Sequence, residues 1–183
     1  MSDDLLRRQL AEIFAADQSR EKTPERGKRP EPSRLRMVAV RPLGDDLIES
    51  FLKAQGFRRL RDEDGEFIVR FAGQDHRLGG IDIGIAIDGE DGTILELRAS
   101  FDARFEPSRF AAALILCNDW NRQFRNPKAV LLIRDDVAMI VLRQCLVYES
   151  GTFEQQVHEV LDFFFAMASQ FHDWALEQGS SVF

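Results

Sequence analysis

Two neighbouring segments alternate between apolar residues and polar or small ones, and this alternation constrains the fold more than any other feature. Residues 81–87 (IDIGIAI) place four isoleucines on one side, and residues 94–101 (ILELRASF) do the same with Leu95, Leu97, Ala99 and Phe101. The intervening residues 88–92 (DGEDG) have the composition of a turn. The pattern predicts an antiparallel hairpin with one covered face and one polar face.

The rest of the chain supplies further elements in a regular order. A helix capped by Asp45 or Asp46 is expected to stop at Gly56. A second helix begins at Pro107, and a long final helix follows Gly151-Thr152 and ends near residue 178. Strands are expected at residues 66–71, 129–134 and 137–148, in addition to the hairpin. The order α-β-β-β-α-β-β-α predicts an α+β fold, in which helices pack on one face of an antiparallel sheet of about five strands.

Two elements carry more apolar surface than such a sheet requires. The strand 137–148 is apolar on both faces, and a half-exposed antiparallel strand needs only one apolar face. The final helix has an apolar arc wider than the roughly 100° stripe that one contact face requires, and Phe163 and Trp174 flank it. We therefore predict a two-fold symmetric homodimer with this strand or the 107–121 helix near its axis. A charge at Ile140 or Leu142 should produce monomers or unfolded protein.

The 107–121 helix contains the side chains that are hardest to assign. Its expected apolar stripe consists of Phe110, Ala113, Leu114, Cys117 and Trp120. Trp120 is expected to act as a core anchor. Asn118 and Asn121 are suited to the end of a helix, but Asn121 also continues the stripe and would then point inward, where it needs hydrogen-bond partners. Both interpretations stay open at this stage.

The N-terminal part of the chain differs from the rest in composition. Residues 1–16 read as an amphipathic helical arm with Leu6, Leu10, Ile13 and Phe14 on one stripe. Residues 17–36 contain three prolines, many charges and almost no apolar residue, which indicates a basic, Pro-rich linker. The folded domain is expected at residues 37–179.

Charge and cysteine content restrict the class of partner and the compartment. The formal net charge of −7 argues against nucleic acid and anionic membranes as partners, because both require a basic surface. Two cysteines, Cys117 and Cys145, cannot build a disulfide framework, and the N-terminus lacks the apolar core of a secretion signal. No run is long enough to span a membrane. These features predict a cytoplasmic protein with reduced thiols.

The sequence contains no recognisable catalytic or metal-binding constellation. His158 and His172 are 14 helical residues apart, about 21 Å, so they cannot share a metal ion. The cysteines lack ligand spacing, and no phosphate-binding glycine loop or nucleophile motif is present. We predict no catalytic residues, no metal and no cofactor.

One string of residues resembles a known family. Residues 117–122 (CNDWNR), followed by Pro127-Lys128-Ala129, resemble the N-x-W-N…P-K-A signature of the YbjN-like family. Residues 65–70, 91–99, 151–152 and 172–174 agree with the resemblance, which runs from about Leu43 to about Trp174. It implies a fold similar to that of type III secretion chaperones, which are small, acidic, non-enzymatic dimers that hold a partner over apolar patches. The family's label as a sensory transduction regulator names no chemistry, and it supplies no catalytic residues.

The sequence therefore predicts a non-enzymatic protein-binding module, chaperone-like or regulatory, that acts as a homodimer and binds an unidentified protein. The alternative is a small-ligand sensor with an apolar pocket under the final helix, and an enzyme ranks last. The residues expected to build the core or the partner surface are Asn118, Trp120, Asn121, Pro127, Ile140, Leu142, Phe163 and Trp174.

Overall fold

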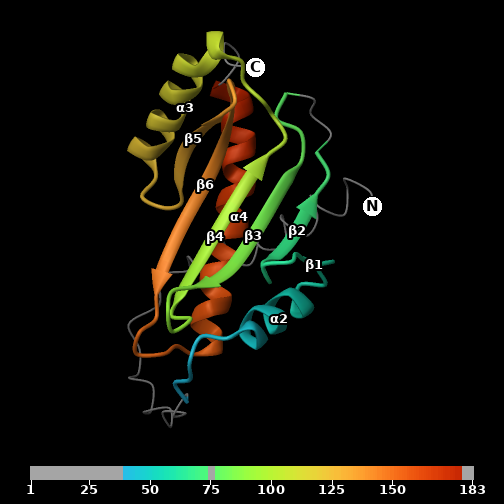
Figure 1. Cartoon of the computed structure of the whole chain (residues 1–183), viewed down its shortest axis with the longest axis vertical. Helices are drawn as coiled ribbons and strands as arrows, with labels where there is room; N and C mark the ends of the chain where they lie inside the picture. Colours follow the sequence, from blue (N-terminus) through green and yellow to red (C-terminus); the bar gives the residue numbers. More distant parts are fainter. Residues whose placement is uncertain (1–38, 74–76, 179–183) are drawn as a thin grey trace, which may run out of the picture. The chain divides into compact units, whose positions relative to one another are not determined.

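The computed structural model describes residues 39–73 and 77–178, so the arm and the linker expected at residues 1–36 lie outside the described residues. Ten elements follow in chain order (Figure 1). They are α2 (Asp45–Ala54), β1 (Leu60–Arg61), β2 (Phe67–Phe71), β3 (Ile81–Asp88), β4 (Ile94–Phe101), the 3-10 helix η1 (Pro107–Arg109), α3 (Phe110–Gln123), β5 (Lys128–Arg134), β6 (Val137–Val147) and α4 (Glu154–Gln178).

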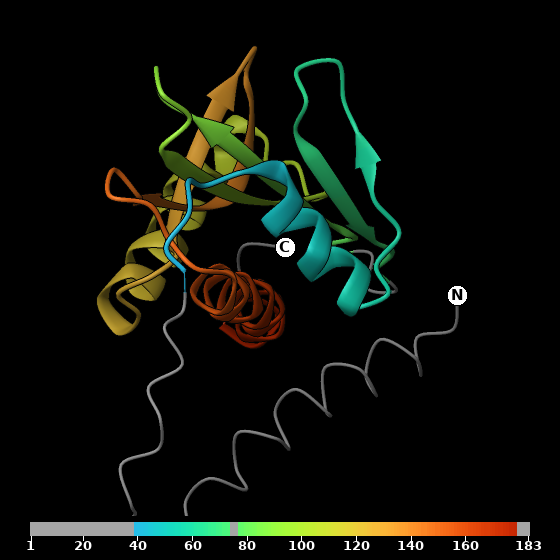
Figure 2. The same cartoon turned by 90° about the horizontal axis from the view of Figure 1, so that it is seen from below.

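The strands form one antiparallel sheet in the order β1-β2-β3-β4-β6-β5. The sheet contains six strands, where the sequence predicted about five. The additional strand is β1, which could not be predicted because its two residues are both exposed and too few to show a period. The α+β class is as predicted. Figure 2 shows that α4 runs beneath the sheet with α2 beside it, and α3 lies next to β5 at the sheet edge in Figure 1.

The β3–β4 hairpin confirms the alternation that the sequence shows. Ile85 pairs with Leu97 and Ile83 with Ala99, and all four side chains are buried on the face that α4 covers. Arg98, between two of the buried positions, is exposed on the opposite face. The period of two therefore assigns one face of the hairpin to the core.

The core beneath the sheet is rich in phenylalanine. The largest fully buried side chains include Trp120 and the five rings of Phe51, Phe67, Phe101, Phe164 and Phe171. Phe has no polar group to satisfy, so these rings fill the layer between sheet and helices without a hydrogen-bonding requirement.

The start of α2 differs from the sequence prediction. Gly44, in extended conformation, is the N-cap residue and makes no side-chain hydrogen bond. Asp45 and Asp46 lie in the first turn instead, where carboxylates favour the helix dipole, and their side chains pair with Arg61 and Arg41.

The end of α2 lies close to the predicted position. The helix ends at Ala54, and Gly56 follows with a φ of 68°. The backbone N–H groups of Gly56 and Phe57 donate to the carbonyls of Lys53 and Leu52, which is the Schellman arrangement that glycine permits.

The buried faces of the two later helices differ from those that helical periodicity predicts, which on the final helix is the series Phe153, Val157, Val160, Phe164, Met167 and Phe171. On α3, Leu116 is buried and Leu114 is exposed, although Leu114 was assigned to the stripe. On α4, Leu161 is fully buried and Val160 only partly. Both helices contact neighbours on more than one side, so a single stripe centred on the largest apolar residues misplaces the inward direction.

Candidate functional site

The family-like residues of α3 lie where its last turn meets β5. Trp120 is 0% exposed, and its ring lies 5.0 Å from that of Phe171 and 5.4 Å from that of Trp174, centroid to centroid. Its indole N–H donates a hydrogen bond of 2.9 Å to the carbonyl oxygen of buried Pro127, which follows a cis peptide bond. Trp120 thus joins α3, the loop before β5 and α4.

Asn121 points inward and bonds the edge of β5 with both ends of its amide. Its Nδ2 donates to the carbonyl oxygen of Ala129 at 2.9 Å, and the Ala129 N–H donates to its Oδ1 at 2.8 Å. Because β5 is an edge strand, these two backbone groups have no neighbouring strand to pair with. The Asn121 amide therefore makes, at Ala129, the two hydrogen bonds that a neighbouring strand would otherwise make.

Lys128 completes the same junction. Its Nζ donates to the carbonyl oxygens of Asn121 and Phe124, at 3.2 and 3.1 Å, where the end of α3 leaves carbonyls without helical partners. Asn118 is exposed on α3, three residues before Asn121. The junction uses Trp120, Asn121, Pro127 and Lys128 for packing and backbone bonds, which leaves few of their polar atoms free to meet a substrate.

The remaining predicted residues do not form one site, because some lie in the core and others at the surface. Ile140 and Leu142 are buried on the face of β6 that the helices of the same chain cover, so they are core residues and not a surface for a second copy. The opposite face of β6 accounts for the second apolar row, in which Val137 is exposed and Met139 half-buried. Phe163 is exposed on α4, and Trp174 is half-buried beside Trp120.

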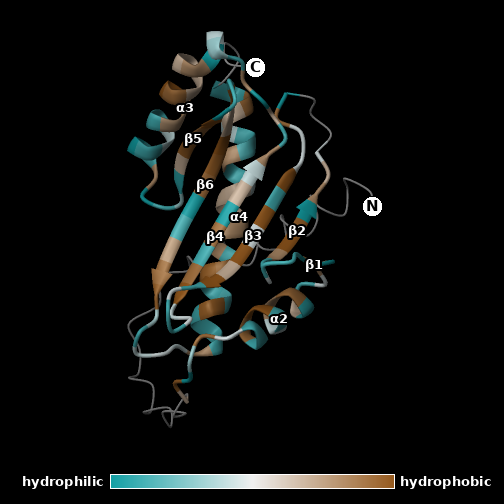
Figure 3. Ribbon diagram, in the orientation of Figure 1, coloured by the Kyte–Doolittle hydropathy of each residue, from teal (hydrophilic) through white to brown (hydrophobic). Residues whose placement is uncertain are grey.

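An exposed apolar surface lies on α3 and the end of the β5–β6 hairpin, where Figure 3 shows strongly hydrophobic ribbon in β5 and the adjoining part of β6. We call it the α3–β5 surface. It contains five of the nine large exposed apolar side chains in the described part of the chain: Leu114, Ile115, Leu132, Ile133 and Val137. Leu132 and Val137 lie on the open face of the sheet, and Ile133 lies on the face that the helices cover, so the surface extends over both faces of the hairpin end. Ile115 is 61% exposed and Ile133 57%. The sequence analysis did not identify Ile115 as a surface residue. An apolar residue outside the predicted stripe of α3 would be expected to face solvent, so its position could have indicated this.

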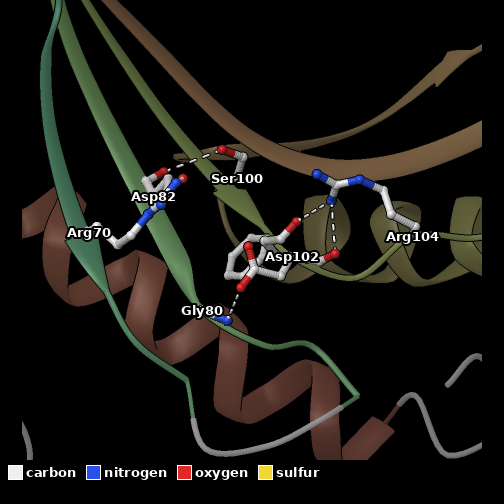
Figure 4. Close-up of polar contacts among 7 residues, drawn as sticks. Arg70, Gly80, Asp82, Ser100, Asp102 and Arg104 are labelled. Carbon is white, nitrogen blue, oxygen red and sulfur yellow. Dashed lines mark hydrogen bonds and ion pairs between the residues drawn. The ribbon is translucent and has the colours of Figure 1, made fainter. Parts of the chain in front are cut away.

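The other half of the open sheet face is charged. Arg70 of β2 pairs with Asp82 of β3 at 2.6 Å, as Figure 4 shows, and Arg143 of β6 pairs with Glu96 of β4. Cross-strand pairs of this kind make much of this half of the open face polar, although Val147 at the far end of β6 is also exposed.

A third ion pair crosses over β3. Glu66 and Arg98 meet at 2.6 Å above Gly84, where a Cβ atom would lie only 2.1 Å from the Glu66 carboxylate. Burial raises the pKa of Glu66, although Arg98 acts in the opposite direction. The glycine therefore gives a carboxylate and a guanidinium room to pair across a central strand.

The end of β4 carries a compact set of polar contacts. The carboxylate of Asp102 accepts a 2.8 Å bond from the Gly80 N–H, and the Arg104 guanidinium donates to three successive backbone carbonyls, at residues 101–103 (Figure 4). These contacts fasten the chain where it leaves the sheet, and Phe105 then bridges to Ala138.

Two hollows lined by described residues do not match the apolar pocket expected under the final helix. One, of about 640 Å³, is lined mainly by charged residues and glycines near the start of α2 and the β3–β4 turn. The other, of about 320 Å³, lies beside it near residues 40–43 and 148–151. The layer between α4 and the sheet contains the fully buried Phe164 and Phe171.

Among residues 39–73 and 77–178, no three His, Cys, Asp or Glu side chains lie together as a metal ion would need. Burial raises the pKa of the Cys117 thiol to about 12, whereas Cys145 is exposed. No helix of the described segments has the length and apolar character needed to cross a membrane.

One solved structure has a fold similar to this architecture. The crystal structure of YbjN from E. coli is similar, with a TM-score of 0.54 and 16% identity over 71% of this chain and 91% of that one. A structure of an uncharacterized protein from Methanothermobacter thermautotrophicus has a TM-score of 0.40 and 12% identity, over 74% of this chain and 99% of that one. No curated protein matches the chain.

A family model matches most of the chain. It covers residues 44–177, from the N-cap of α2 to the last turn of α4, and so includes the whole α3–β5 junction. The family is described as "Putative bacterial sensory transduction regulator". The chain therefore belongs to the YbjN family.

Proposed function

We propose that this chain is a non-enzymatic, protein-binding regulator that acts as a homodimer, with a chaperone-like or adaptor role in the cytoplasm. The family description supports a regulatory role. The use of the most distinctive residues, Trp120 and Asn121, in packing and backbone bonds supports a binding role over a catalytic one.

The α3–β5 surface is the observation that carries the proposal. Large exposed apolar side chains cost free energy in water, and here five, between 41% and 61% exposed, gather at one end of the domain. Charged pairs occupy much of the rest of the open face, so the exposed apolar side chains are most concentrated at the α3–β5 surface. This surface is the site at which a second copy packs.

The proposed contact is isologous, so each apolar residue of one copy meets the same surface of the other. The backbone edge of β5 contributes little, because Asn121 already occupies Ala129 and α3 lies beside the strand (Figure 1). The contact is therefore made by side chains of α3 and of the hairpin end, chiefly Leu114, Ile115 and Ile133.

The proposal is tested by charging the α3–β5 surface without touching the core. Ile115→Asp should convert a dimer into a folded monomer, whose light-scattering mass is close to the 21.0 kDa of one chain. Val147→Asp is the matched control, because Val147 is similarly exposed at the other end of β6, and this variant should remain dimeric. A folded Ile115→Asp protein with the mass of the parent dimer would contradict the proposed interface.

A further inference from the structure

Two adjoining hollows form a groove at the end of the sheet where α2 and α4 begin (Figure 1). The larger hollow, of about 640 Å³, lies between the start of α2, the β1–β2 turn and the strands β3 and β4. The smaller one, of about 320 Å³, lies between residues 40–43, the β3–β4 turn and residues 148–151. Leu43, Asp91 and Gly92 line both hollows, so the two are parts of one groove. We call it the β3–β4 groove.

The larger part of the β3–β4 groove carries an excess of negative charge. Six carboxylates and two guanidinium groups line it. Both guanidinium groups are already paired with carboxylates that line the same hollow. Asp64 and Asp91 are exposed, and in the part of the chain that the structure describes their carboxylates have no hydrogen-bond or ion-pair partner. The larger part therefore favours a cationic group.

The smaller part is more apolar and contains a buried polar group without a partner. Val40, which is 62% exposed, and Pro42 line it. Tyr148 lines it as well; this residue is 7% exposed, and its hydroxyl has no hydrogen-bond partner among residues 39–73 and 77–178. Buried hydroxyls are normally paired, because the loss of hydration is otherwise uncompensated. A peptide segment in the groove brings backbone carbonyls that can accept this bond, whereas a metal cation brings none.

We propose that the β3–β4 groove binds a segment of a partner protein that carries lysine or arginine close to an apolar side chain. The inference rests on the proposed protein-binding function and names the partner's chemistry. The cationic side chain lies in the larger part, between Asp64 and Asp91, and the apolar side chain lies against Val40. Complementary charge selects this segment over an acidic one, because further carboxylates in the larger part would be repelled.

Short synthetic peptides test the groove on the full-length chain. Two peptides contain lysines and leucines in opposite orders, and two matched peptides have glutamate in place of lysine. Fluorescence anisotropy should show binding of a lysine peptide and of neither glutamate peptide, and this binding should weaken as salt is raised from about 50 to about 500 mM.

Charge reversal locates the cationic part of the site. Asp91→Lys should lower the affinity for the lysine peptide at least about tenfold. Asp64→Lys, in the β1–β2 turn, should have the same effect, so the test does not depend on the folding of one variant. Glu159→Lys is the control: it makes the same change of charge at an exposed position of α4, outside the groove and the α3–β5 surface, and should leave the affinity unchanged.

A matched pair of valines locates the apolar part. Val40 and Val147 are both 62% exposed, but Val147 lines neither hollow and lies outside the α3–β5 surface. Val40→Ser should lower the affinity for the lysine peptide about threefold or more, and Val147→Ser should leave it unchanged.

Several results would overturn the proposal. They are equal affinity for lysine and glutamate peptides, a loss in Glu159→Lys as large as that in Asp91→Lys, and the absence of binding by either lysine peptide. A dimeric parent that binds neither lysine peptide contradicts the groove alone. A monomeric parent that binds a lysine peptide through Asp91 supports the groove and contradicts the homodimer.

Discussion

Trp120 shows at the scale of one residue how the family-like string acts. Its ring contacts two rings of α4, and its N–H reaches the loop before β5. A buried aromatic side chain with a satisfied polar group contributes apolar burial and a fixed orientation together.

Trp120→Ala should lower the free energy of unfolding by about 3–5 kcal/mol, because it leaves a large cavity and an unpaired Pro127 carbonyl. Urea unfolding followed by circular dichroism measures the change. Phe163→Ala is the control, since removing this exposed ring should lower the free energy of unfolding far less. An unchanged midpoint for Trp120→Ala would show that the ring is not a core anchor.

Asn121 is a second residue whose role is local. The sequence left its direction open, because helix periodicity cannot show whether a neighbouring strand needs a partner for its edge. The structure resolves this: the amide replaces a missing strand at Ala129.

Asn121→Ala should lower the free energy of unfolding by about 1–3 kcal/mol, because the N–H and the carbonyl of Ala129 lose their partners. Asn118→Ala, on the same helix but exposed, should change stability by no more than about 0.5 kcal/mol. The same urea titrations compare the two variants. Equal losses for both would mean that the bonds to Ala129 contribute nothing specific.

The two cysteines should differ in reactivity and in their effect on stability at alkaline pH. Burial raises the pKa of Cys117 to about 12, so at about pH 8 a thiol reagent should modify Cys145 and leave Cys117 unmodified in the folded protein. A raised folded pKa also means that stability falls as pH rises above the unfolded value of about 8.5.

At about pH 10, the raised pKa of Cys117 should lower the free energy of unfolding by about 2 kcal/mol. The Cys117→Ala variant, compared with the parent in urea at about pH 7 and about pH 10, should lack this part of the decline, and Cys145→Ser should keep it. Rapid modification of both thiols in the folded protein would contradict the buried position of Cys117.

At the scale of elements, the sequence indicated most of the sheet. The β3–β4 hairpin follows from strict alternation. The strands expected at 129–134 and 137–148 leave only Asp135 and Asp136 between them, and both have the positive φ of a tight hairpin turn. The rotation of α3 and the strand β1 could not be predicted, since they depend on contacts with α4, β5 and β2 that no local pattern encodes.

Strand β6 is the clearest case of a pattern that allowed two explanations. Two apolar faces suggested an interface through Ile140 and Leu142, yet the helices of the same chain cover that face. The other face, with Val137 and Met139, is the one that remains open at the hairpin end.

Ile140→Asp should therefore prevent folding, because an unpaired charge would enter the core. Val147→Asp, at an exposed position of the same strand outside the α3–β5 surface, should fold with a midpoint close to that of the parent. Circular dichroism and urea unfolding distinguish the two. A well-folded Ile140→Asp protein would show that this face is not enclosed by the chain's own helices.

At the scale of the whole molecule, the domain combines a core that is complete under one face of the sheet with an apolar surface, the α3–β5 surface, that folding leaves exposed. We propose that a second copy packs on this surface.

The mass of the unmodified chain in solution tests the central claim most directly. Sedimentation velocity over a range of protein concentrations should give a single species of twice the 21.0 kDa chain mass. A species of 21.0 kDa that persists at the highest concentration would contradict the homodimer and the role assigned to the α3–β5 surface.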